Sequence, residues 1–407
     1  MSADTYVIVG ASLAGAKAAE TLRAEGFDGA IVLIGAESER PYERPPLSKD
    51  ILLGKADRNK AFVHEPGWYA EHDVDLRMGS RVTSIDRSAR QVRLEDGSAV
   101  GYTRLLLATG AAPRRLPVPG ADLAGLLYLR TLADSEALLA ALGQGGQVVI
   151  AGAGWIGLEV AAAARGRGAS VTLLEADTLP LRRILGDEVA TIFADLHREK
   201  GVDLRFGVGV SEIRSEDGAA SVVLADGSSV PADLIVVGIG VRPASDLAEA
   251  AGIAVDRGVL VDAALQTSAP DVYAAGDVAA VDHAWLPGRI HVEHWANALA
   301  SGPAAAKSMA GQQVSYDVIP FFFSDQYDLG MEYAGYVGPD GYDEVVFRGD
   351  VGAREFIAFY VKDGRLIAGL NANVWDVSDK IQAVIRAGKP VDSARLADPE
   401  VALEDLA

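Results

Sequence analysis

The chain has 407 residues, no cysteine and a formal net charge of −20. The lack of cysteine excludes disulfides, a cysteine nucleophile, a redox-active Cys-x-x-Cys pair and Cys-ligated iron–sulfur clusters. The acidic balance argues against a nucleic-acid partner, which would need Lys and Arg to neutralise phosphates.

The N-terminal segment predicts a strand–turn–helix–strand unit. The β-branched run at 5–9 is typical of a buried strand, and "GASLAG" at 10–15 is typical of a tight turn. Residues 14–26 predict a helix that ends on glycine, and 30–34 predict the next strand. Glu37 follows that strand closely.

The same pattern returns in the middle of the chain. Residues 147–151 predict a strand, "GAGWIG" at 152–157 a turn, and 156–168 a helix that again ends on glycine. A strand at 170–174 then leads into Glu175.

The similarity of the two units continues downstream. Residues 82–100 and 210–230 share Val-x-x-Ile, an alternating strand and Asp-Gly-Ser, which predicts a hairpin in each. Apolar strands that end in glycine follow at 105–113 and 234–243. We interpret this as duplication of a whole domain.

The last third of the chain contains two further segments. Residues 267–279 predict a strand that leads to Gly276 and Asp277. From about Phe321 the chain is richer in aromatic residues and alternating strands, which predicts a third domain.

Each glycine turn predicts a dinucleotide site. The glycines permit a tight turn, close approach of a pyrophosphate and close packing of helix on strand, and the helix N-terminus favours phosphate. Ser12 stands at the middle glycine position of the first copy. Glu175 favours NADH over NADPH, whereas Arg182 and Arg183 could pair with a 2′-phosphate. Two such sites indicate a retained flavin beside a mobile nicotinamide.

Several motifs together resemble one protein family over essentially the whole chain. They include "PYERPPLSKD" (41–50), "LLLATGAAPR" (105–114), "GWIGLEVAA" (154–162), "VYAAGDVA" (272–279) and "FFFSDQYD" (321–328). The chain is similar to the FAD-dependent NADH:ferredoxin reductases of bacterial oxygenase systems, which support aromatic hydrocarbon catabolism.

The resemblance implies an α/β fold. Two Rossmann-like dinucleotide-binding domains of the glutathione-reductase-like type are expected, with a small α+β C-terminal domain. The implied boundaries are 1–113 with 244–320 for the FAD-binding domain, 114–243 for the NAD-binding domain and 321–407 for the C-terminal domain.

The resemblance also implies roles for particular residues. Those expected to contact FAD are Gly10, Ser12, Ala14, Gly15, Glu37, Lys49, Val82, Ala108, Thr109, Gly110, Arg130, Gly276, Asp277 and Trp295. Those expected to contact NADH are Gly152, Gly154, Ile156, Gly157, Glu159, Glu175, Arg183, Ile239 and Gly240. Lys49, near the flavin ring, and Glu159, at the nicotinamide end, are the expected catalytic residues. Asp277 is expected to contact the ribityl chain of FAD from the start of a helix. Ala36 stands where the family often has an acid, which leaves open whether Glu37 takes that role.

The implied activity is hydride transfer from NADH to FAD, followed by single-electron transfer to a [2Fe–2S] ferredoxin that serves a dioxygenase or cytochrome P450. A cysteine-free NADH oxidase or diaphorase is one alternative. A redox-sensing flavoprotein similar to apoptosis-inducing factor is another.

We expect a monomer with neither a membrane nor a nucleic-acid partner. No apolar run approaches the ~18 residues of a membrane span, and no signal-peptide pattern is seen, so a cytoplasmic location is expected. His291 and His294 could share a helix face, but no carboxylate–histidine pattern surrounds them, and no metal site is expected.

Overall fold

The computed structural model describes residues 4–123, 126–143, 145–216, 219–286 and 288–406. The chain forms two compact units. The first contains Met1–Glu43, Asn59–Ala112 and Val241–Pro320, and the second contains Arg44–Arg58, Pro113–Gly240 and Phe321–Ala407. Residues 44–58, which the expected boundaries assign to the FAD-binding domain, therefore pack in the second unit. The division into three domains stays a prediction.

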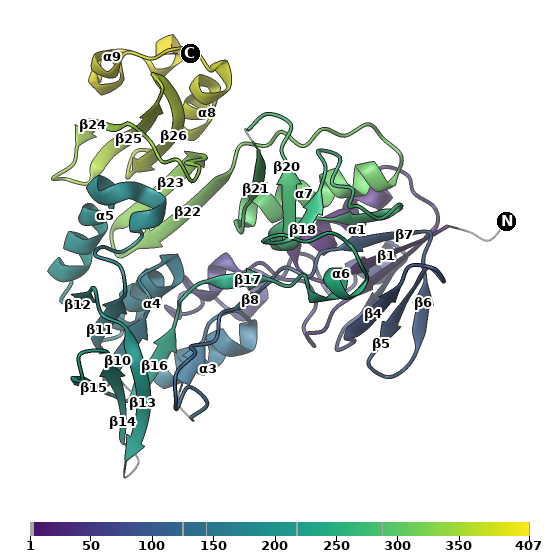
Figure 1. Ribbon diagram of the computed structural model, residues 1–407, viewed down its shortest axis with the longest axis horizontal. Helices are drawn as coiled ribbons and strands as arrows, with labels where there is room; N and C mark the ends of the chain where they lie inside the picture. The colour runs from purple at the N-terminus through teal and green to yellow at the C-terminus, as the bar shows by residue number, and fades with distance from the viewer. Residues whose placement is uncertain (1–3, 124–125, 144, 217–218, 287, 407) are drawn as a thin grey trace. The chain divides into compact units, whose positions relative to one another are not determined.

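The first unit is built around a parallel sheet. Its strand order is β19-β7-β1-β2-β3, from β1 (Thr5–Val9), β2 (Ala30–Ile34), β3 (Val74–Arg77), β7 (Arg104–Leu107) and β19 (Val272–Ala274). Figure 1 labels β1 and β7 of this sheet. These strands are short apolar runs, as expected for strands buried on both faces.

The remaining elements of the first unit complete its core. Helix α1 (Leu13–Ala24) follows β1, and α7 (Trp295–Met309) packs against it so closely that a Cβ on Gly302 would lie 2.3 Å from the Ala14 carbonyl oxygen. The other elements are α2 (Trp68–Glu71), β4 (Val82–Asp86), β5 (Gln91–Leu94), β6 (Ala99–Gly101), β8 (Ala111–Pro113), β17 (Val241–Pro243), α6 (Asp246–Ala250), β18 (Val259–Val261), the 3-10 helix η3 (Gly276–Val278), β20 (Ala279–Asp282) and β21 (Arg289–His291).

The second unit repeats the parallel sheet. Its order is β12-β11-β10-β16-β9, from β9 (Leu126–Tyr128), β10 (Gln147–Ala151), β11 (Ser170–Glu175), β12 (Asp203–Phe206) and β16 (Leu234–Val237). The helices with it are α3 (Leu132–Leu142), α4 (Trp155–Gly166) and α5 (Arg182–Glu199), and η1 (Pro45–Leu47) is a short 3-10 helix. A second 3-10 helix, η2 (Arg58–Ala61), begins at the last residue of the second unit's first segment and belongs mostly to the first unit. In both units the strand before the glycine turn lies between two parallel neighbours: β1 between β7 and β2, and β10 between β16 and β11.

Antiparallel elements accompany the parallel sheets. The predicted hairpins are confirmed as β4-β5-β6 and as β13 (Val210–Glu216), β14 (Ala219–Leu224) and β15 (Ser229–Ala232). Residues from Phe321 onward form a five-stranded sheet in the order β22-β23-β26-β25-β24, followed by short helices. Their bounds are β22 (Phe321–Gln326), β23 (Leu329–Gly335), β24 (Glu344–Asp350), β25 (Glu355–Lys362), β26 (Arg365–Ala372), α8 (Ser378–Ala387), α9 (Ser393–Ala397) and η4 (Leu403–Leu406).

The predicted helix ends agree with the structure to within about two residues. Helix α1 and helix α4 are followed by Gly26 and Gly168, which adopt positive φ angles of 81° and 85°. A glycine in this conformation just beyond a helix satisfies the last carbonyl groups without a side-chain clash.

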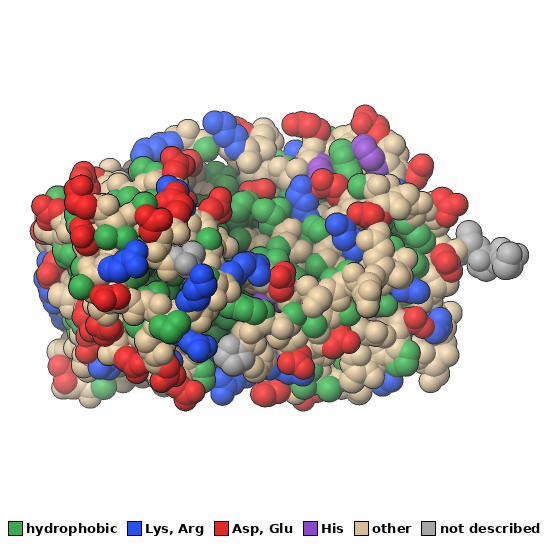
Figure 2. All heavy atoms as spheres, turned by 90° about the horizontal axis from the view of Figure 1, so that it is seen from above, with side chains coloured by type: hydrophobic (Ala, Val, Ile, Leu, Met, Phe, Trp, Pro, Cys, Tyr) green, Lys and Arg blue, Asp and Glu red, His purple; other side chains and the backbone are tan. Residues whose placement is uncertain are grey.

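The surface carries many charges of both signs. Figure 2 shows acidic and basic side chains spread over one face, with hydrophobic and other polar groups between them. Within the described part of the chain, none of the helices is long and apolar enough to span a bilayer.

Candidate active site

The first glycine turn, at the end of β1, has the geometry of a dinucleotide cradle. Gly10 adopts a φ of +119°, and a Cβ there would lie 2.0 Å from the carbonyl oxygen of Ala108. A Cβ on Gly15 would lie 2.0 Å from the Gly10 carbonyl oxygen. Both glycines are therefore required for close packing. Ser12 is the N-cap of α1 and makes no side-chain capping bond.

Further residues expected to contact FAD lie around this turn in the same unit. A Cβ on Gly276 would be 3.1 Å from the Ala14 Cβ, and the Gly276 N–H donates to Ser301 Oγ at 2.9 Å. Asp277 lies in η3, which has three residues and leads directly into β20. The expectation of a helix start at Asp277 is thus correct only for this short 3-10 turn.

Two acids in the first unit are oriented by aromatic side chains. The Tyr42 hydroxyl donates to Glu37, and the Trp295 indole N–H donates to Glu43 at 3.2 Å. Ala36, by contrast, is exposed. Glu37 is therefore the carboxylate that the fold holds after β2.

Three other expected FAD-contact positions belong to the framework of the first unit. Val82 begins β4 and is packed in the core. The Thr109 hydroxyl donates to the Ala244 carbonyl oxygen at 2.8 Å, next to Gly110 with its positive φ of 68°.

The second glycine turn repeats the cradle in the second unit. Gly152 has a φ of +103°, and a Cβ there would be 2.5 Å from the Gly238 carbonyl oxygen and 3.1 Å from the Ile239 nitrogen. A Cβ on Gly157 would be 2.0 Å from the Gly152 carbonyl oxygen, whereas one on Gly154 would meet nothing within 4 Å. The middle position thus has room for a side chain, which explains how Ser12 fits the first copy.

The acid after the second strand lies against this turn. Glu175 Oε2 accepts from the Ala153 N–H at 2.7 Å, and Oε1 accepts from the Asp177 N–H at 2.9 Å. On the neighbouring helix α4, Ile156 is 40% exposed although it is apolar. Gly240 follows β16 with a φ of +92°.

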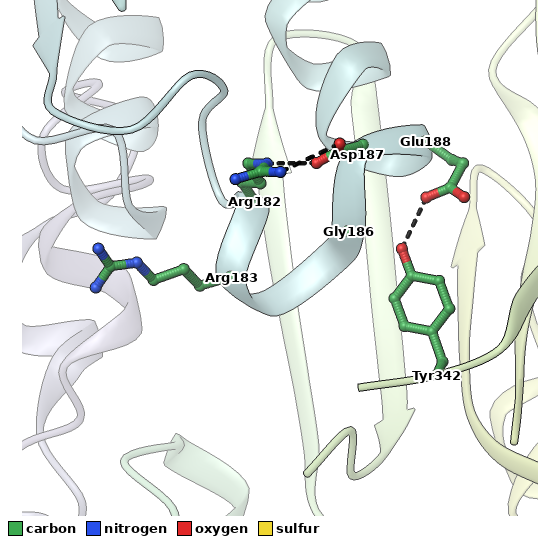
Figure 3. A pocket seen from close by; sticks show the side chains of 6 residues that line it. All are labelled: Arg182, Arg183, Gly186, Asp187, Glu188 and Tyr342. Carbon is green, nitrogen blue, oxygen red and sulfur yellow. Dashed lines mark hydrogen bonds and ion pairs between the residues drawn. The ribbon is translucent and has the colours of Figure 1, made fainter. Parts of the chain in front are cut away.

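A pocket of about 400 Å³ lies close by in the second unit (Figure 3). It is lined by Arg182, Arg183, Gly186, Asp187, Glu188 and Tyr342. Gly186 breaks the helical path of α5, and a Cβ there would be 1.7 Å from the Tyr342 hydroxyl oxygen. That hydroxyl donates to Glu188 at 2.7 Å.

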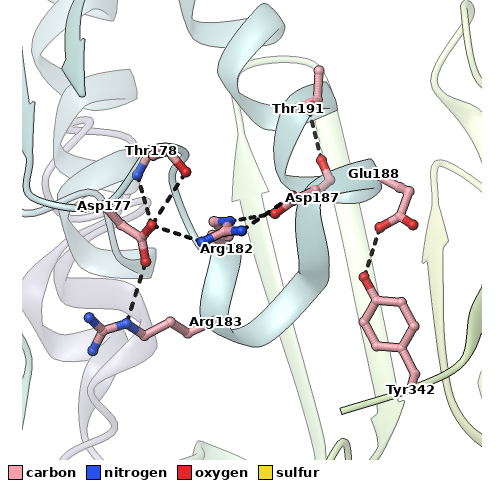
Figure 4. A network of polar contacts seen from close by, with 8 residues as sticks. All are labelled: Asp177, Thr178, Arg182, Arg183, Asp187, Glu188, Thr191 and Tyr342. Carbon is pink, nitrogen blue, oxygen red and sulfur yellow. Dashed lines mark hydrogen bonds and ion pairs between the residues drawn. The ribbon is translucent and has the colours of Figure 1, made fainter. Parts of the chain in front are cut away.

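The arginines of this pocket are engaged by carboxylates (Figure 4). Arg182 Nε lies 2.5 Å from Asp187, and its NH1 lies 3.4 Å from Asp177. Arg183 Nε lies 3.5 Å from Asp177, although 90% of the Arg183 side chain is exposed. The Thr178 N–H and the two arginines hold the pKa of Asp177 below its usual range. Neither arginine is therefore a free cation for a 2′-phosphate.

The structure brings the two expected catalytic residues together. Lys49 Nζ lies 2.6 Å from Glu159 Oε1, and their side chains are 13% and 3% exposed. Lys49 follows η1, whose two prolines fix its start, and Glu159 lies on α4. The Lys49 ammonium also lies over the Phe323 ring, 5.3 Å from its centroid. An ion pair this deeply buried needs further hydrogen bonds to offset desolvation.

Two serines supply those bonds, and the sequence analysis missed both. Ser48 Oγ donates to Glu159 Oε2 at 2.5 Å, and Ser324 Oγ donates to Oε1 at 2.7 Å. Both stand inside motifs quoted for the family resemblance. The signal for Ser324 was the alternation of β22, in which Phe322, Ser324 and Gln326 share the buried face.

Other predicted residues are placed more loosely or differently. Arg130 lies in the second unit, where its N–H donates to Asp134 at 3.1 Å and its carbonyl oxygen accepts from Arg44. His291 ends β21 and His294 is the N-cap of α7, so the expectation that they could share a helix face is wrong. No group of three or more His, Asp or Glu side chains in the described ranges could hold a metal ion.

Two glycine cradles at strand–helix junctions, with an acid after each, define the chain as an oxidoreductase of the two-dinucleotide type. The family profile of pyridine nucleotide-disulphide oxidoreductases matches residues 4–302, and that of the reductase C-terminal domain matches residues 321–407. The chain belongs to the pyridine nucleotide-disulphide oxidoreductase family.

Several curated relatives of the chain are ferredoxin reductases. It is 40% identical to the ferredoxin–NAD(+) reductase component of the anthranilate 1,2-dioxygenase system of Burkholderia cepacia, over 99% of both chains. It is 39% identical to the corresponding component of the biphenyl dioxygenase system of Paraburkholderia xenovorans, over 99% of this chain and 98% of the relative. The covalent putidaredoxin reductase–putidaredoxin complex matches with a TM-score of 0.94 and 37% identity, over 99% of this chain and 98% of that one.

These comparisons confirm four of the predictions made from the sequence. The family, the α/β fold class, the enzyme class and the use of FAD and NAD(H) are as expected.

Proposed function

We propose that this chain takes a hydride from NADH onto FAD and passes electrons singly to a [2Fe–2S] ferredoxin, which serves a dioxygenase or a cytochrome P450. One observation carries the proposal. The chain has two dinucleotide cradles and no cysteine, although it belongs to the pyridine nucleotide-disulphide oxidoreductase family. Without a cysteine pair to take electrons onward, the chain requires a separate acceptor.

The first cradle suits FAD. Helix α1 has no acidic residue in its first turn, and Ser12 leaves its N-terminal N–H groups uncapped, so its positive end is available to a pyrophosphate. We assign Gly10, Ser12 and Gly15 to that pyrophosphate and Glu37 to the ribose. When bound, FAD accepts a hydride and releases electrons one at a time, which no side chain does.

The second cradle suits NADH rather than NADPH. Gly152, Gly154 and Gly157 leave the start of α4 open, and Glu175 is placed at the turn for a ribose hydroxyl. A carboxylate repels a 2′-phosphate. Arg182 and Arg183, the arginines of the adjacent pocket, both lie within 3.5 Å of Asp177, whose negative charge opposes their attraction for a 2′-phosphate.

The ion pair between Lys49 and Glu159 gives the site a fixed cation. Catalysis of hydride transfer depends mostly on positioning, so a rigid charge contributes without a proton-transfer step. We assign Lys49 to the flavin ring and Glu159 to the nicotinamide end. Glu159 then pairs with Lys49 Nζ and fixes its direction.

The proposal includes finer statements on oligomeric state, location and domain bounds, of which only the bounds follow from the family resemblance. The reductase acts as a monomer in the cytoplasm. FAD is held by residues 1–113 and 244–320 and NADH by 114–243. Residues 321–407 form the C-terminal domain.

NADH-driven reduction of cytochrome c, with and without a [2Fe–2S] ferredoxin, tests the proposal. A stimulation that saturates with ferredoxin is expected. Fast NADH consumption that ferredoxin does not change would instead establish an oxidase or diaphorase, and slow turnover in both cases would favour a redox sensor.

A matched pair of variants tests the site. Lys49→Gln is expected to slow flavin reduction by NADH, whereas Lys55→Gln makes the same charge change at an exposed position nearby and is expected to leave it unchanged. Equal rates in the two variants would contradict the assignment of Lys49.

A further inference from the structure

A row of hydrogen-bonded polar side chains leads away from Glu159 through the interior of the second unit. It consists of Ser324 and Gln326 on β22, His197 on α5 and Tyr327, and we call it the polar row. Ser324, Gln326 and His197 are at most 1% exposed. Burying polar groups lowers stability unless each one is hydrogen-bonded, and every member of the polar row has such a bond.

The partners fix the direction of each bond. The Gln326 amide nitrogen donates to Ser324 Oγ at 3.1 Å, and its amide oxygen lies 2.8 Å from His197 Nε2. An amide oxygen can only accept, so Nε2 carries the ring proton. Burial lowers the pKa of His197 to about 4, and the neutral ring then accepts at Nδ1 from the Tyr327 hydroxyl at 3.3 Å.

Every donor in the polar row therefore points toward Glu159. Because Ser324 Oγ accepts from Gln326, its own hydrogen is free for Glu159 Oε1. That oxygen also receives Lys49, while Ser48 takes the other oxygen. Aligned donors strengthen one another, and a negative charge at the accepting end favours the alignment.

We infer that Ser324, held by Gln326 and His197, is a positioning residue that fixes the Glu159 carboxylate and, through it, the Lys49 ammonium. The inference rests on the proposed function, and it adds a residue to the site formed by Lys49 and Glu159. It also gives residues 321–326 a part in hydride transfer: they complete the surroundings of an ion pair formed by two other segments of the chain.

Ser324→Ala tests the inference in the FAD-loaded protein. Its limiting rate of flavin reduction at saturating NADH, measured by anaerobic stopped flow, is expected to fall about tenfold, the effect of one hydrogen bond to a charged group. Ser324→Thr keeps the hydroxyl and is expected to stay within about twofold. Failure of this conservative variant to retain the rate would overturn the inference.

Ser378→Ala is the matched control. It deletes a serine–carboxylate bond of 2.6 Å to Glu332 in the same C-terminal segment, far along the chain from Glu159. It is expected to leave the rate unchanged. If it slowed flavin reduction as much as Ser324→Ala, loss of packing in this segment would be the cause and the inference would fall.

A second readout does not depend on activity. In crystal structures, the distance between Lys49 Nζ and Glu159 Oε1 is expected to increase in Ser324→Ala and to stay at 2.6 Å in Ser378→Ala. An unchanged distance in Ser324→Ala would contradict a positioning role. Tyr327→Phe changes the far end of the polar row and gives an independent test. The rate of flavin reduction is expected to fall about twofold. A rate equal to that of the unaltered protein would contradict a role for the polar row.

Combination with Glu159→Gln separates this inference from the proposed function. In that background Ser324→Ala is expected to cause no further loss, because both changes act through one carboxylate. Additive losses would overturn the inference. If Glu159→Gln alone left flavin reduction unchanged, the proposed role of the ion pair would fail instead.

Discussion

Gly157→Ala is expected to destabilise the second unit, whereas Gly154→Ser, three residues away in the same turn, is not. Gly157 begins the packing of α4 against β10, and its added Cβ would lie 2.0 Å from the Gly152 carbonyl oxygen. Gly154 is the N-cap of α4 and has an extended backbone, with nothing within 4 Å of an added Cβ. Serine is also a favoured N-cap residue.

The magnitude follows from the contact. Real Cβ atoms almost never approach another heavy atom closer than 3.0 Å, so helix and turn must separate by at least 1.0 Å. Overpacking of this kind costs about 1–3 kcal/mol, and the upper end applies because the clashing atom belongs to the backbone. Alanine regains up to about 1 kcal/mol of helix propensity over glycine. The net loss is therefore about 2 kcal/mol, or roughly 4–8 °C in Tm.

Thermal unfolding of the FAD-loaded protein, followed by circular dichroism, measures the difference. Gly154→Ser should stay within about 0.5 kcal/mol of the unaltered protein, since nothing clashes and the cap is kept. The reasoning would be refuted if Gly157→Ala were as stable as the unaltered protein, or if both variants lost the same amount.

Three further predictions concern the cofactor preference, the pH response and the electron path. Asp177→Asn should release Arg183 to pair with a 2′-phosphate and raise the ratio of kcat/KM for NADPH to that for NADH by about tenfold; an unchanged ratio would show that Glu175 alone sets the preference. Burial lowers the pKa of His197 to about 4, so the unfolded chain binds a proton that the folded one excludes. The unfolding free energy should therefore fall as the pH drops from about 6.5 to about 4, by at most about 3 kcal/mol from this group. Urea unfolding across that range should show a shallower fall in His197→Gln, and an identical fall would contradict the assignment. Thiol-alkylating reagents should leave NADH-driven ferredoxin reduction unchanged because the chain has no cysteine; inhibition would indicate a reactive thiol on the ferredoxin, which assays with pretreated ferredoxin would identify.

Much of the fold could be predicted because its signals are local. Strands 5–9, 30–34 and 147–151 are short apolar runs whose bounds agree with the structure, and the Asp-Gly dipeptides gave both hairpins. The glycine turns were recognisable for the same reason: backbone angles that only glycine adopts readily leave a mark within a few residues.

The limits of the sequence appear where a short segment is ambiguous. The turn at Asp277 was expected to start a helix, but three residues of 3-10 helix lead straight into β20. His291 and His294 have helical spacing, yet one ends a strand and the other precedes a helix. Spacing alone does not decide between these outcomes, since packing of the neighbouring elements chooses the backbone path.

The sequence by itself determined the two cradles, the expected ligands and the class of chemistry, because these depend on glycines, acids and the absence of cysteine. Only the tertiary structure decided that Glu159 is shared by Lys49, Ser48 and Ser324, which are up to 165 positions away along the chain. It also decided that Asp177 faces both arginines. Such contacts form where separate segments pack, and no local pattern encodes them: a buried carboxylate accepts whichever donors the fold brings within reach.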